Sequence, residues 1–392
     1  MKKNFLLISV FSLSICHAQK YQKLHRKAIV VDTHNDVLST VVMKGMNIEN
    51  DLTGKSHSDI ARFKKGGVDV QIFSVFSDER FGKDTAFKYA NIEIDSLYAI
   101  VGRNTDKMMM VTNTSQLKQA VRQHKIGCMI GVEGGHMIED NLQYLDSLYQ
   151  RGARYMTLTW NNSTSWATSA ADESKNKMPF GSKGLTEFGK QVVRRMNESG
   201  MIVDVSHVGE QTFRDAINTT TKPVIASHSC AYALCPVSRN LKDDQIKAIG
   251  RNGGVIHLNF YSGFLDSNYN KRKDAFLLKH KQQVDSLKEI KWANYEIEEY
   301  ISKKYPEEAN ALRPPLSVLL DHLDYIVKLI GVDHVGLGSD FDGIESAPQQ
   351  LDDVTDFPLI TKELLKRGYG KRDIRKILGG NFLRIYKANS KQ

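Results

Sequence analysis

Residues 28–36 read Ala-Ile-Val-Val-Asp-Thr-His-Asn-Asp, an apolar run that ends in a cluster of side chains able to bind a metal ion. The run predicts a buried strand, and because alternate side chains of a strand share a face, His34 and Asp36 are expected to point the same way. An imidazole and a carboxylate on one face can hold one cation. The stretch therefore predicts a strand that brings a metal-binding pair to its end.

The same His-x-Asp spacing recurs at residues 57–59 and 322–324. The second copy lies in a run with helical apolar spacing, and residues two apart on a helix do not face each other. The first copy directly precedes a predicted helix, so Ser58 or Asp59 suits the N-cap of that helix. Neither copy predicts a metal site.

Short apolar runs rich in β-branched or aromatic residues recur along the chain, each followed by polar residues and a helical pattern. Continuous apolar character indicates strands that are buried on both faces, as parallel strands are. Strands that alternate with helices in this way predict an α/β fold of the (β/α)8 TIM-barrel type. The eight predicted strands are residues 28–36, 68–76, 126–133, 155–160, 201–207, 223–228, 254–260 and 334–340.

Two connections are longer than a minimal barrel needs: residues 77–104 after the second strand and 268–312 after the seventh. Both follow the ends of strands at which barrel enzymes keep their active sites, so either is a candidate lid. For most of residues 268–312, which are dense in Lys, Glu and Tyr, we favour a solvated helical hairpin without a catalytic role.

Residues 1–18 have the pattern of a signal peptide, with Lys2 and Lys3 before a short apolar stretch and small residues that permit cleavage after Ala18. Residues 19–392 are then expected to form a single (β/α)8 domain that is exported to a bacterial periplasm or secreted. No later segment has a membrane-spanning pattern. The net charge of +9 is spread in scattered basic pairs, which is typical of a solvated surface and predicts no nucleic-acid partner.

The cysteines leave two questions open. Cys16 suggests a lipoprotein signal, but the bulky Ile15 before it favours the ordinary signal peptide. Of the other three, Cys128 lies in an apolar run and is expected to be a buried thiol. An odd number excludes complete pairing within the chain, and a bridge between Cys230 and Cys235 remains an alternative to free thiols.

Metal-capable residues fall at the ends of several predicted strands, and parallel strands of a barrel all end on the same side. The set suits two cations, which Glu133 can bridge, and paired metals lower the pKa of a shared water for hydrolysis. Nitrogen and oxygen ligands without thiolate favour two Zn²⁺, with manganese, iron or cobalt as alternatives. Asp340 is then free to move a proton. The residues are His34, Asp36, Glu133, His207, His228 and Asp340.

Six motifs surround these residues along the chain. They are Asp32-Thr-His-Asn-Asp36, Gly131-Val-Glu-Gly-Gly-His136, Asp204-Val-Ser-His207, Ser227-His-Ser-Cys-Ala-Tyr232, Ser238-Arg-Asn240 and Gly338-Ser-Asp-Phe-Asp-Gly343. The motifs resemble the membrane (renal) dipeptidase family, a di-zinc branch of the amidohydrolase barrels, and the resemblance runs from about Ala28 to the C-terminal helix. It implies that His34 and Asp36 bind one zinc, that Glu133 bridges, and that His207 and His228 bind the second.

The resemblance also implies catalytic and substrate-binding roles. Asp340 matches the proton shuttle, and Arg239 matches the arginine that binds the terminal carboxylate of the substrate, with Tyr261 beside it. A planar guanidinium binds a carboxylate in a bidentate way and keeps its charge, which suits this role. For Tyr261, an equal alternative to substrate binding is a structural role, as an aromatic side chain packed at the end of a strand.

The sequence departs from the family at the fourth strand, where Trp160 stands in place of a histidine that contacts the substrate and the developing oxyanion. An indole donates one hydrogen bond and carries no charge. Loss of one oxyanion donor can reduce turnover ~10²- to 10³-fold, so Asn161 or Asn162 is expected to supply a donor, or the preferred substrate differs.

The leading hypothesis is an exported di-zinc dipeptidase for short peptides, including those with a C-terminal D-residue. One alternative is a related barrel metallohydrolase that acts on a lactone, an ester or an N-acyl amino acid. The reason for this alternative is Trp160, which replaces the family histidine. The other is a non-catalytic protein that binds peptides or metal. A homodimer is an open alternative to a monomer.

Overall fold

The computed structural model describes residues 20–78 and 81–390. Its strands are β1 (Val31–Asn35), β2 (Val70–Val75), β3 (Met108–Met110), β4 (Ile126–Glu133), β5 (Ala153–Thr157), β6 (Ile202–Asp204), β7 (Ile225–Ala226), β8 (Val255–Leu258) and β9 (Val335–Leu337). All eight predicted strands are present as β1, β2 and β4 to β9. The short β3 was not predicted, and the fourth predicted strand begins and ends earlier than expected, so that Trp160 lies three residues beyond it.

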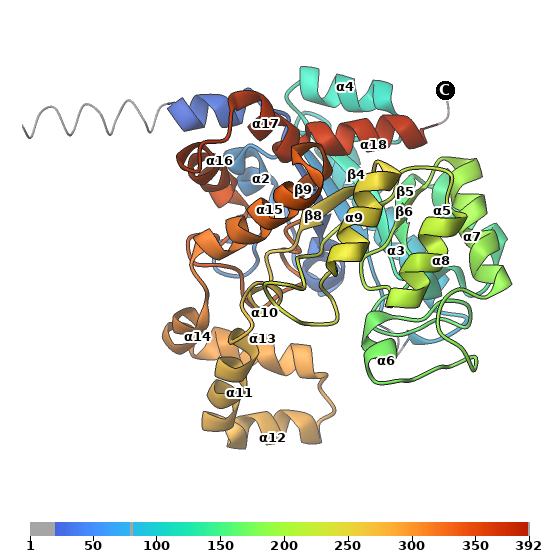
Figure 1. The fold of residues 1–392 in the computed structure, drawn as a ribbon. Coiled ribbons are helices and arrows are strands. Elements are labelled where there is room, and N and C mark those ends of the chain that lie inside the picture. Colours follow the sequence, from blue (N-terminus) through green and yellow to red (C-terminus); the bar gives the residue numbers. More distant parts are fainter. Residues whose placement is uncertain (1–19, 79–80, 391–392) are drawn as a thin grey trace, which may run out of the picture.

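The helices lie between and around these strands (Figure 1). The α-helices are α2 (Ile60–Gly66), α3 (Ala86–Arg103), α4 (Thr114–Arg122), α5 (Leu142–Gln150), α6 (Ala170–Ser174), α7 (Glu187–Ser199), α8 (Glu210–Thr219), α9 (Asp243–Asn252), α10 (Ser262–Leu265), α11 (Tyr269–Lys279), α12 (Lys281–Glu289), α13 (Asn294–Lys304), α14 (Pro306–Leu312), α15 (Leu316–Ile330), α16 (Phe357–Lys366), α17 (Lys371–Arg375) and α18 (Asn381–Asn389). Short 3₁₀ or π turns are η1 (Leu38–Val42), η3 (Gly135–Ile138), η4 (Val332–His334), η5 (Val354–Asp356) and η6 (Lys376–Gly380).

The sheet is parallel throughout and nearly closes on itself, which confirms the predicted (β/α)8 barrel. The strands follow the order β1-β2-β4-β5-β6-β7-β8-β9, and β3 pairs with Ile126, Gly127 and Cys128 at the beginning of β4. The two ends of the sheet meet just beyond β9, where Asp340 N donates to His34 O at 3.1 Å and Asp36 N donates to Phe341 O at 2.9 Å. The closure therefore brings Asp340, from the end of the last strand, next to His34 and Asp36 at the end of the first strand.

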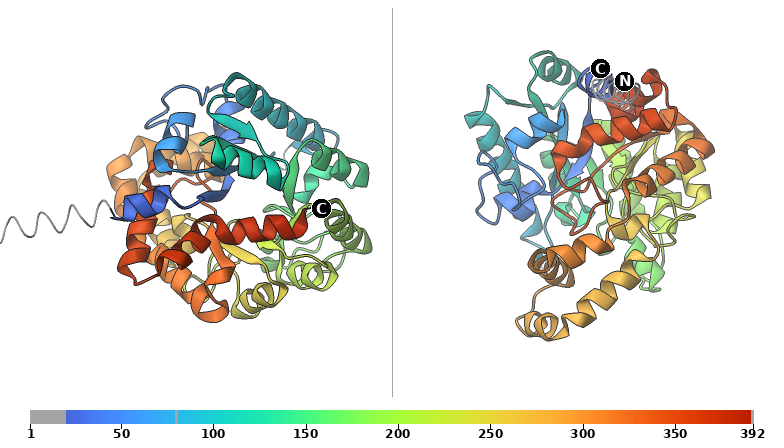
Figure 2. Two further views of the ribbon diagram at one scale, coloured as in Figure 1. Left: turned by 90° about the horizontal axis from the view of Figure 1, so that it is seen from above. Right: turned by 90° about the vertical axis from the view of Figure 1, so that its left-hand side faces the viewer.

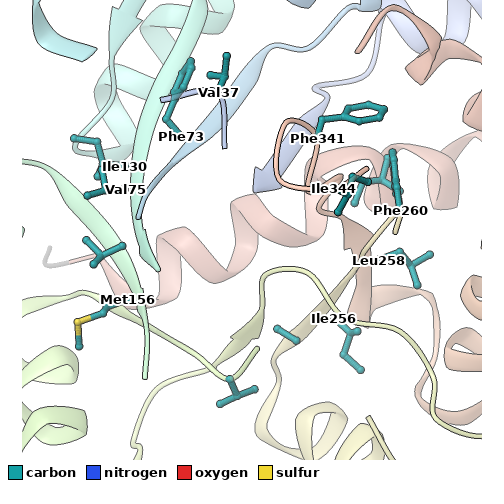
Figure 3. Close-up of a cluster of buried hydrophobic side chains, with 14 of the residues drawn as sticks. Val37, Phe73, Val75, Ile130, Met156, Ile256, Leu258, Phe260, Phe341 and Ile344 are labelled. Carbon is teal, nitrogen blue, oxygen red and sulfur yellow. The ribbon is translucent and has the colours of Figure 1, made fainter. Parts of the chain in front are cut away.

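Two apolar clusters hold the barrel, because alternate residues of each strand face opposite sides. One cluster takes residues such as Val70, Ile72 and Met129 together with Phe382 and Tyr386 of α18, and so fills the barrel interior at the end where the strands begin. The other cluster lies between the strands and the surrounding helices. Figure 3 shows part of it, including Phe73, Val75, Ile130, Met156, Ile256 and Leu258 from β2, β4, β5 and β8.

The barrel interior at mid-height is filled by the ring of Tyr155. A Cβ on Gly131 of the neighbouring strand would lie 2.1 Å from that ring, so only glycine fits opposite it. This close approach lets the tyrosine hydroxyl reach β1, where it donates to Thr33 O at 2.9 Å.

Local signals in the sequence set several helix ends as predicted. Asp59 caps α2 by accepting a hydrogen bond from Arg62 N, and the 322–324 pair lies on α15. A further local signal ends α7, whose C-cap is Gly200; its φ of 91° belongs to the left-handed region that glycine adopts at low cost.

The connection after β8 lies at the end of the barrel opposite α4 and α18 (Figures 1 and 2). The first long connection contains α3, which lies alongside the barrel in contact with β2, β3 and β4. The second, after β8, contains α10 to α14, and α11 to α14 form a separate unit around a small core of Phe276, Val284, Ile297 and Ile301. Pro306 begins α14 instead of interrupting a helix. Both connections therefore extend from the side on which the strands end.

Cys128, Cys230 and Cys235 are buried free thiols, so the structure excludes the bridge between Cys230 and Cys235. Cys230 and Cys235 face separate backbone carbonyls, those of Asn259 and Gly263. The predicted signal peptide and Cys16 lie outside the described residues. Within residues 20–78 and 81–390, no helix combines the length and apolarity that crossing a membrane requires.

Candidate functional site

Glu133, the last residue of β4, is at the centre of a cluster of three buried imidazoles. Its Oε2 lies 3.3 Å from His34 Nε2, and its Oε1 lies 2.9 Å from His207 Nε2 and 3.6 Å from His228 Nε2. The two histidines that follow β6 and β7 also approach each other, with 2.9 Å between their Nε2 atoms. The strand ends thus converge as the sequence pattern predicts.

Two further carboxylates complete the group on the His34 side. Asp36 Oδ2 lies 3.4 Å and Asp340 Oδ1 4.0 Å from His34 Nε2. Ligand atoms of His34, Asp36 and Asp340 lie within 4.8 Å of one another, as do those of His34, Glu133 and His228. The described residues therefore contain two overlapping groups of the size that metal coordination needs.

The hydrogen bonds on the far side of each ring determine which nitrogen carries the proton. His34 Nδ1 lies 2.8 Å from the hydroxyl of Tyr155, and that hydroxyl donates its own proton to a backbone carbonyl. His228 Nδ1 lies 2.7 Å from Ser227 Oγ, which donates to Asp204. Each oxygen must therefore accept from Nδ1, so Nε2 is the ring nitrogen that remains for a metal ion.

His207 follows the same rule, because its Nδ1 lies 3.1 Å from the amide oxygen of Asn161, which can only accept. All three imidazoles therefore direct Nε2 at the carboxylates. Against the effect of burial, Tyr155, Glu133 and Asp36 raise the pKa of His34 well above its usual value, so a metal ion bound there would displace a proton from its Nε2. Burial, followed by the nearby Arg239, lowers the pKa of His207 to about 4, and burial lowers that of His228 well below its usual value. Both rings are neutral near pH 7 and suited to be metal ligands.

Without a cation this arrangement is unfavourable. Two lone pairs face each other between His207 and His228, and the buried atoms His34 Nε2 and Asp36 Oδ1 have no hydrogen-bond partner. Three carboxylates are also buried together, and burial, with the charges of Asp36 and Glu133, raises the pKa of Asp340 well above its usual value against the opposing effect of His34. Divalent metal ions satisfy each of these groups, so the donor set fits them.

The local backbone turns the ligands inward directly after the strands. His207 and Asp340 adopt left-handed conformations, with φ of 63° and 61°. Such conformations are rare for these residue types and persist where the surroundings hold them. Buried carboxylates hold the neighbouring backbone: Asp204 accepts from Ser206 N and Ser227 N, and Asp32 accepts from Ser339 N.

Asp340 has one oxygen fixed and one facing the ligands. Asn259 Nδ2 donates to its Oδ2 at 2.7 Å, while Oδ1 faces His34. Its side chain is 14% exposed, more than that of Glu133 at 6%, and it lines the pocket described next. This position allows Asp340 to exchange a proton with a bound substrate.

A cavity of about 240 Å³ opens over the ligands. Arg239 forms part of its wall, and its buried guanidinium forms no ion pair with any carboxylate of residues 20–78 and 81–390. It donates to His228 O at 3.3 Å and Ser229 Oγ at 3.5 Å, and its Nε has no partner in this part of the chain. A buried guanidinium that no carboxylate neutralises is suited to bind the carboxylate of a ligand.

Tyr261 and Trp160 also line this cavity, as the sequence predicts, but the structure gives them different surroundings. The hydroxyl of Tyr261 accepts a hydrogen bond from Lys273 at 2.8 Å. The indole of Trp160 packs on Phe76, with 4.7 Å between the ring centroids. The departure from the family pattern thus creates an aromatic wall on the β2 side of the pocket.

The structure separates the two asparagines that the sequence leaves as alternatives. Asn161 lines the cavity and bonds His207, whereas Asn162 does not line it and bonds the adjacent Ser163 O at 3.5 Å. Sequence reasoning missed Tyr155, Asn259 and Lys273 as partners of the site. A tyrosine within a strand gives no signal that its hydroxyl reaches a histidine 121 residues away.

Comparisons with known proteins agree with this chemistry. The profile of the membrane dipeptidase family (Peptidase family M19) matches residues 18–392. An uncharacterized dipeptidase of Schizosaccharomyces pombe is 31% identical over 388 residues, which cover 94% of this chain and 82% of that relative.

Solved structures share the fold. The probable dipeptidase PvdM from Pseudomonas aeruginosa superposes with a TM-score of 0.78 at 25% identity, over 95% of this chain and 98% of its own. A metallo peptidase from Rhodobacter sphaeroides, liganded with a phosphinate mimic of the dipeptide L-Ala-D-Ala, superposes with a TM-score of 0.75 at 22% identity, over 93% of this chain and 100% of its own.

Proposed function

Because this chain belongs to the membrane dipeptidase family and is a metal-dependent dipeptidase, we propose that it is an exported two-zinc enzyme that cleaves dipeptides, including those with a C-terminal D-residue. The observation that carries the two-metal proposal is the orientation of the three imidazoles, each of which uses Nδ1 for a neutral partner and directs Nε2 at the carboxylates. Family membership also removes the alternative of a non-catalytic binding protein.

The ligand set divides naturally around Glu133. His34 and Asp36 would hold one zinc ion, His207 and His228 the other, and the two oxygens of Glu133 face both groups. Zinc ions bound there would lower the pKa of a water molecule and polarise the peptide carbonyl.

The other site residues position the substrate and move the proton. Arg239 binds the terminal carboxylate, which places the peptide bond over the ligands. Asp340 accepts a proton through Oδ1 and delivers it to the leaving amine, while Asn259 holds its other oxygen. Asn161 presents its amide nitrogen to the pocket because its oxygen is occupied by His207. Its amide nitrogen thereby donates a hydrogen bond to the carbonyl oxygen of the substrate. This donor takes the place of the family histidine, at whose position Trp160 stands.

Export rests on the pattern of residues 1–18, and the tolerance of a D-residue is motivated by the ligand of the Rhodobacter sphaeroides peptidase. The deciding experiment is an assay of the purified protein, loaded with zinc, against a dipeptide panel that includes L-Ala-L-Ala and L-Ala-D-Ala. We expect about two zinc ions per chain by elemental analysis, turnover of both peptides, and loss of turnover after chelation. A chain that holds two metals and hydrolyses no dipeptide would contradict the proposal.

The Trp160–Phe76 wall supports a second candidate: the same metals acting on a lactone, an ester or an N-acyl amino acid. The variant Trp160→His separates the two. If the substitution creates dipeptide turnover that the wild type lacks, the second candidate gains. If wild type and variant hydrolyse dipeptides alike, it loses its motive.

A further inference from the structure

Helix α13, in the long connection after β8, contributes to the wall of the catalytic cavity. Tyr295, Glu298 and Glu299 of this helix line the cavity together with the ligands and Arg239. Helix α13 is therefore a part of residues 268–312 that reaches the cavity, whereas the prediction for most of that stretch was a solvated hairpin. Its contacts on the two sides of the cavity show how it is held.

On the β2 side, the hydroxyl of Tyr295 donates to Asp78 Oδ2 at 2.9 Å. Asp78 is 8% exposed and lies two residues beyond Phe76, which forms the aromatic wall with Trp160. This hydrogen bond joins the connection after β8 to the connection after β2, across 217 residues of sequence.

On the β8 and β9 side, Lys273 of α11 joins α13 to the cavity wall. Its Nζ lies 2.7 Å from Glu298 Oε2 of α13, 2.8 Å from the hydroxyl of Tyr261 after β8, and 3.4 Å from Glu345 Oε1 after β9. The lysine side chain is 11% exposed. Its ammonium group therefore bridges three segments in a largely water-excluded position.

Helices α11 and α12 pack against α13. Ile297 and Ile301 of α13 pack with Phe276 of α11 and Val284 of α12 in a core separate from that of the barrel. The helix can therefore move with α11 and α12 as one body when polar contacts to the barrel break.

We propose that α13 is the element that limits substrate length, and that two sets of contacts hold it across the cavity: Tyr295 with Asp78, and Lys273 with Tyr261 and Glu345. This inference rests on the proposed dipeptidase function. Arg239 fixes the free carboxylate at one end of the substrate, so a peptide extended at its amino end needs room that the held helix occupies. Weakening either contact raises the population of the open position, which admits a third residue.

The variant Tyr295→Phe removes one hydroxyl and keeps the ring. Tyr300→Phe is the matched control, because Tyr300 lies on the same helix with similar exposure, 41% against 43%, and packs on Trp292. The measured quantity is the ratio of kcat/KM for L-Ala-L-Ala-L-Ala to that for L-Ala-L-Ala. A hydrogen bond from a side chain that is 43% exposed contributes enough to shift the open population about fivefold, so we expect the ratio to rise about fivefold in Tyr295→Phe and to stay unchanged in the control.

Lys273→Met tests the second contact, and we expect a larger rise of the same ratio because the lysine bridges three segments. Amide hydrogen exchange of residues 294–304 gives a readout that does not need turnover, with faster exchange expected in Tyr295→Phe and Lys273→Met than in Tyr300→Phe. Failure of the wild type to cleave any dipeptide would refute the proposed function, while exchange would still test the contacts. Dipeptide cleavage with the same ratio and the same exchange in all variants would overturn this inference alone.

Discussion

Neutral groups orient the three imidazoles of the site: a tyrosine hydroxyl for His34, an amide oxygen for His207 and a serine hydroxyl for His228. Each acts as an acceptor for Nδ1–H and so determines the nitrogen that faces the carboxylates. The charge of the site is thus concentrated on Glu133 and its neighbouring aspartates. Single substitutions can therefore distinguish a residue that orients a metal ligand from a residue that binds the metal itself.

Asn161→Ala is expected to weaken zinc binding ~10- to 100-fold, because His207 loses the acceptor that fixes its tautomer. Turnover is expected to fall at saturating zinc as well, by ~10²-fold or more, because the donor to the carbonyl oxygen is lost. Titration against a competing chelator and kcat for L-Ala-L-Ala measure the two effects. Asn162→Ala is the matched control, and equal effects at both positions would contradict the role of Asn161.

Asp340→Asn is expected to lower kcat ~10²- to 10⁴-fold while the zinc content stays near two per chain. The amide keeps the size of the side chain and a hydrogen bond with Asn259, but it cannot accept the proton at pH 7. Elemental analysis of the same preparation accompanies the assay. Loss of one zinc with the activity would instead make Asp340 a ligand.

At the scale of elements, helix α2 packs so closely on the turn η5 that no side chain fits between them. A Cβ on Gly66 would lie 1.9 Å from Val354 O. The same helix is capped by Asp59, and Arg62 joins it to Asp353 at 3.0 Å. The connection after β1 is thereby fixed to the connection after β9, on either side of the barrel closure.

Gly66→Ala is therefore expected to destabilise the fold by about 1–3 kcal/mol through displacement of η5. Gly102→Ala in α3 is the matched control: nothing lies within 4 Å of its Cβ position, and alanine favours a helix over glycine by about 0.5–1 kcal/mol. Chemical denaturation gives both values. Effects of the same sign at the two positions would show that the close contact does not govern stability.

At the scale of the whole molecule, the two ends of the barrel differ in function. The candidate metal ligands lie where the strands end, whereas α18 covers the opposite end of the barrel, where the strands begin. Asp69, just before β2, accepts from Val30 N at 2.9 Å and lies at this stabilising end, away from the ligands. Burial raises its pKa from 3.8 to about 6.

The raised pKa of Asp69 makes unfolding pH-dependent. Between pH 3.8 and about 6 the folded chain keeps a proton that the unfolded chain releases, so this group lowers stability as the pH rises, and its full cost is present above pH 6. Asp69→Asn keeps an acceptor for Val30 and is expected to gain about 2–3 kcal/mol at pH 7.5, but little at pH 4. Urea denaturation of wild type and variant at both pH values tests this, and a gain independent of pH would contradict it.

The sequence determined the fold and the family, and it placed the candidate metal ligands at one end of the barrel. Apolar runs such as 126–133 marked strands buried on both faces, and residues such as Glu133 and His228 stood at their ends. In a parallel barrel the topology alone brings all strand ends to one side, so positions along the chain were enough to place these groups together. The short β3 escaped detection because Met108–Met110 has neither the length nor the β-branched composition of the other runs.

The tertiary structure alone decided how the groups act on one another. It paired His34 with Tyr155, selected Asn161 over Asn162, left Cys230 and Cys235 as free thiols, and placed α13 over the cavity. Each of these outcomes depends on a side chain meeting a partner from a distant segment, at a distance and angle set by packing. Periodicity in the sequence predicts which face a residue occupies, but only the packed structure determines which atom it meets there.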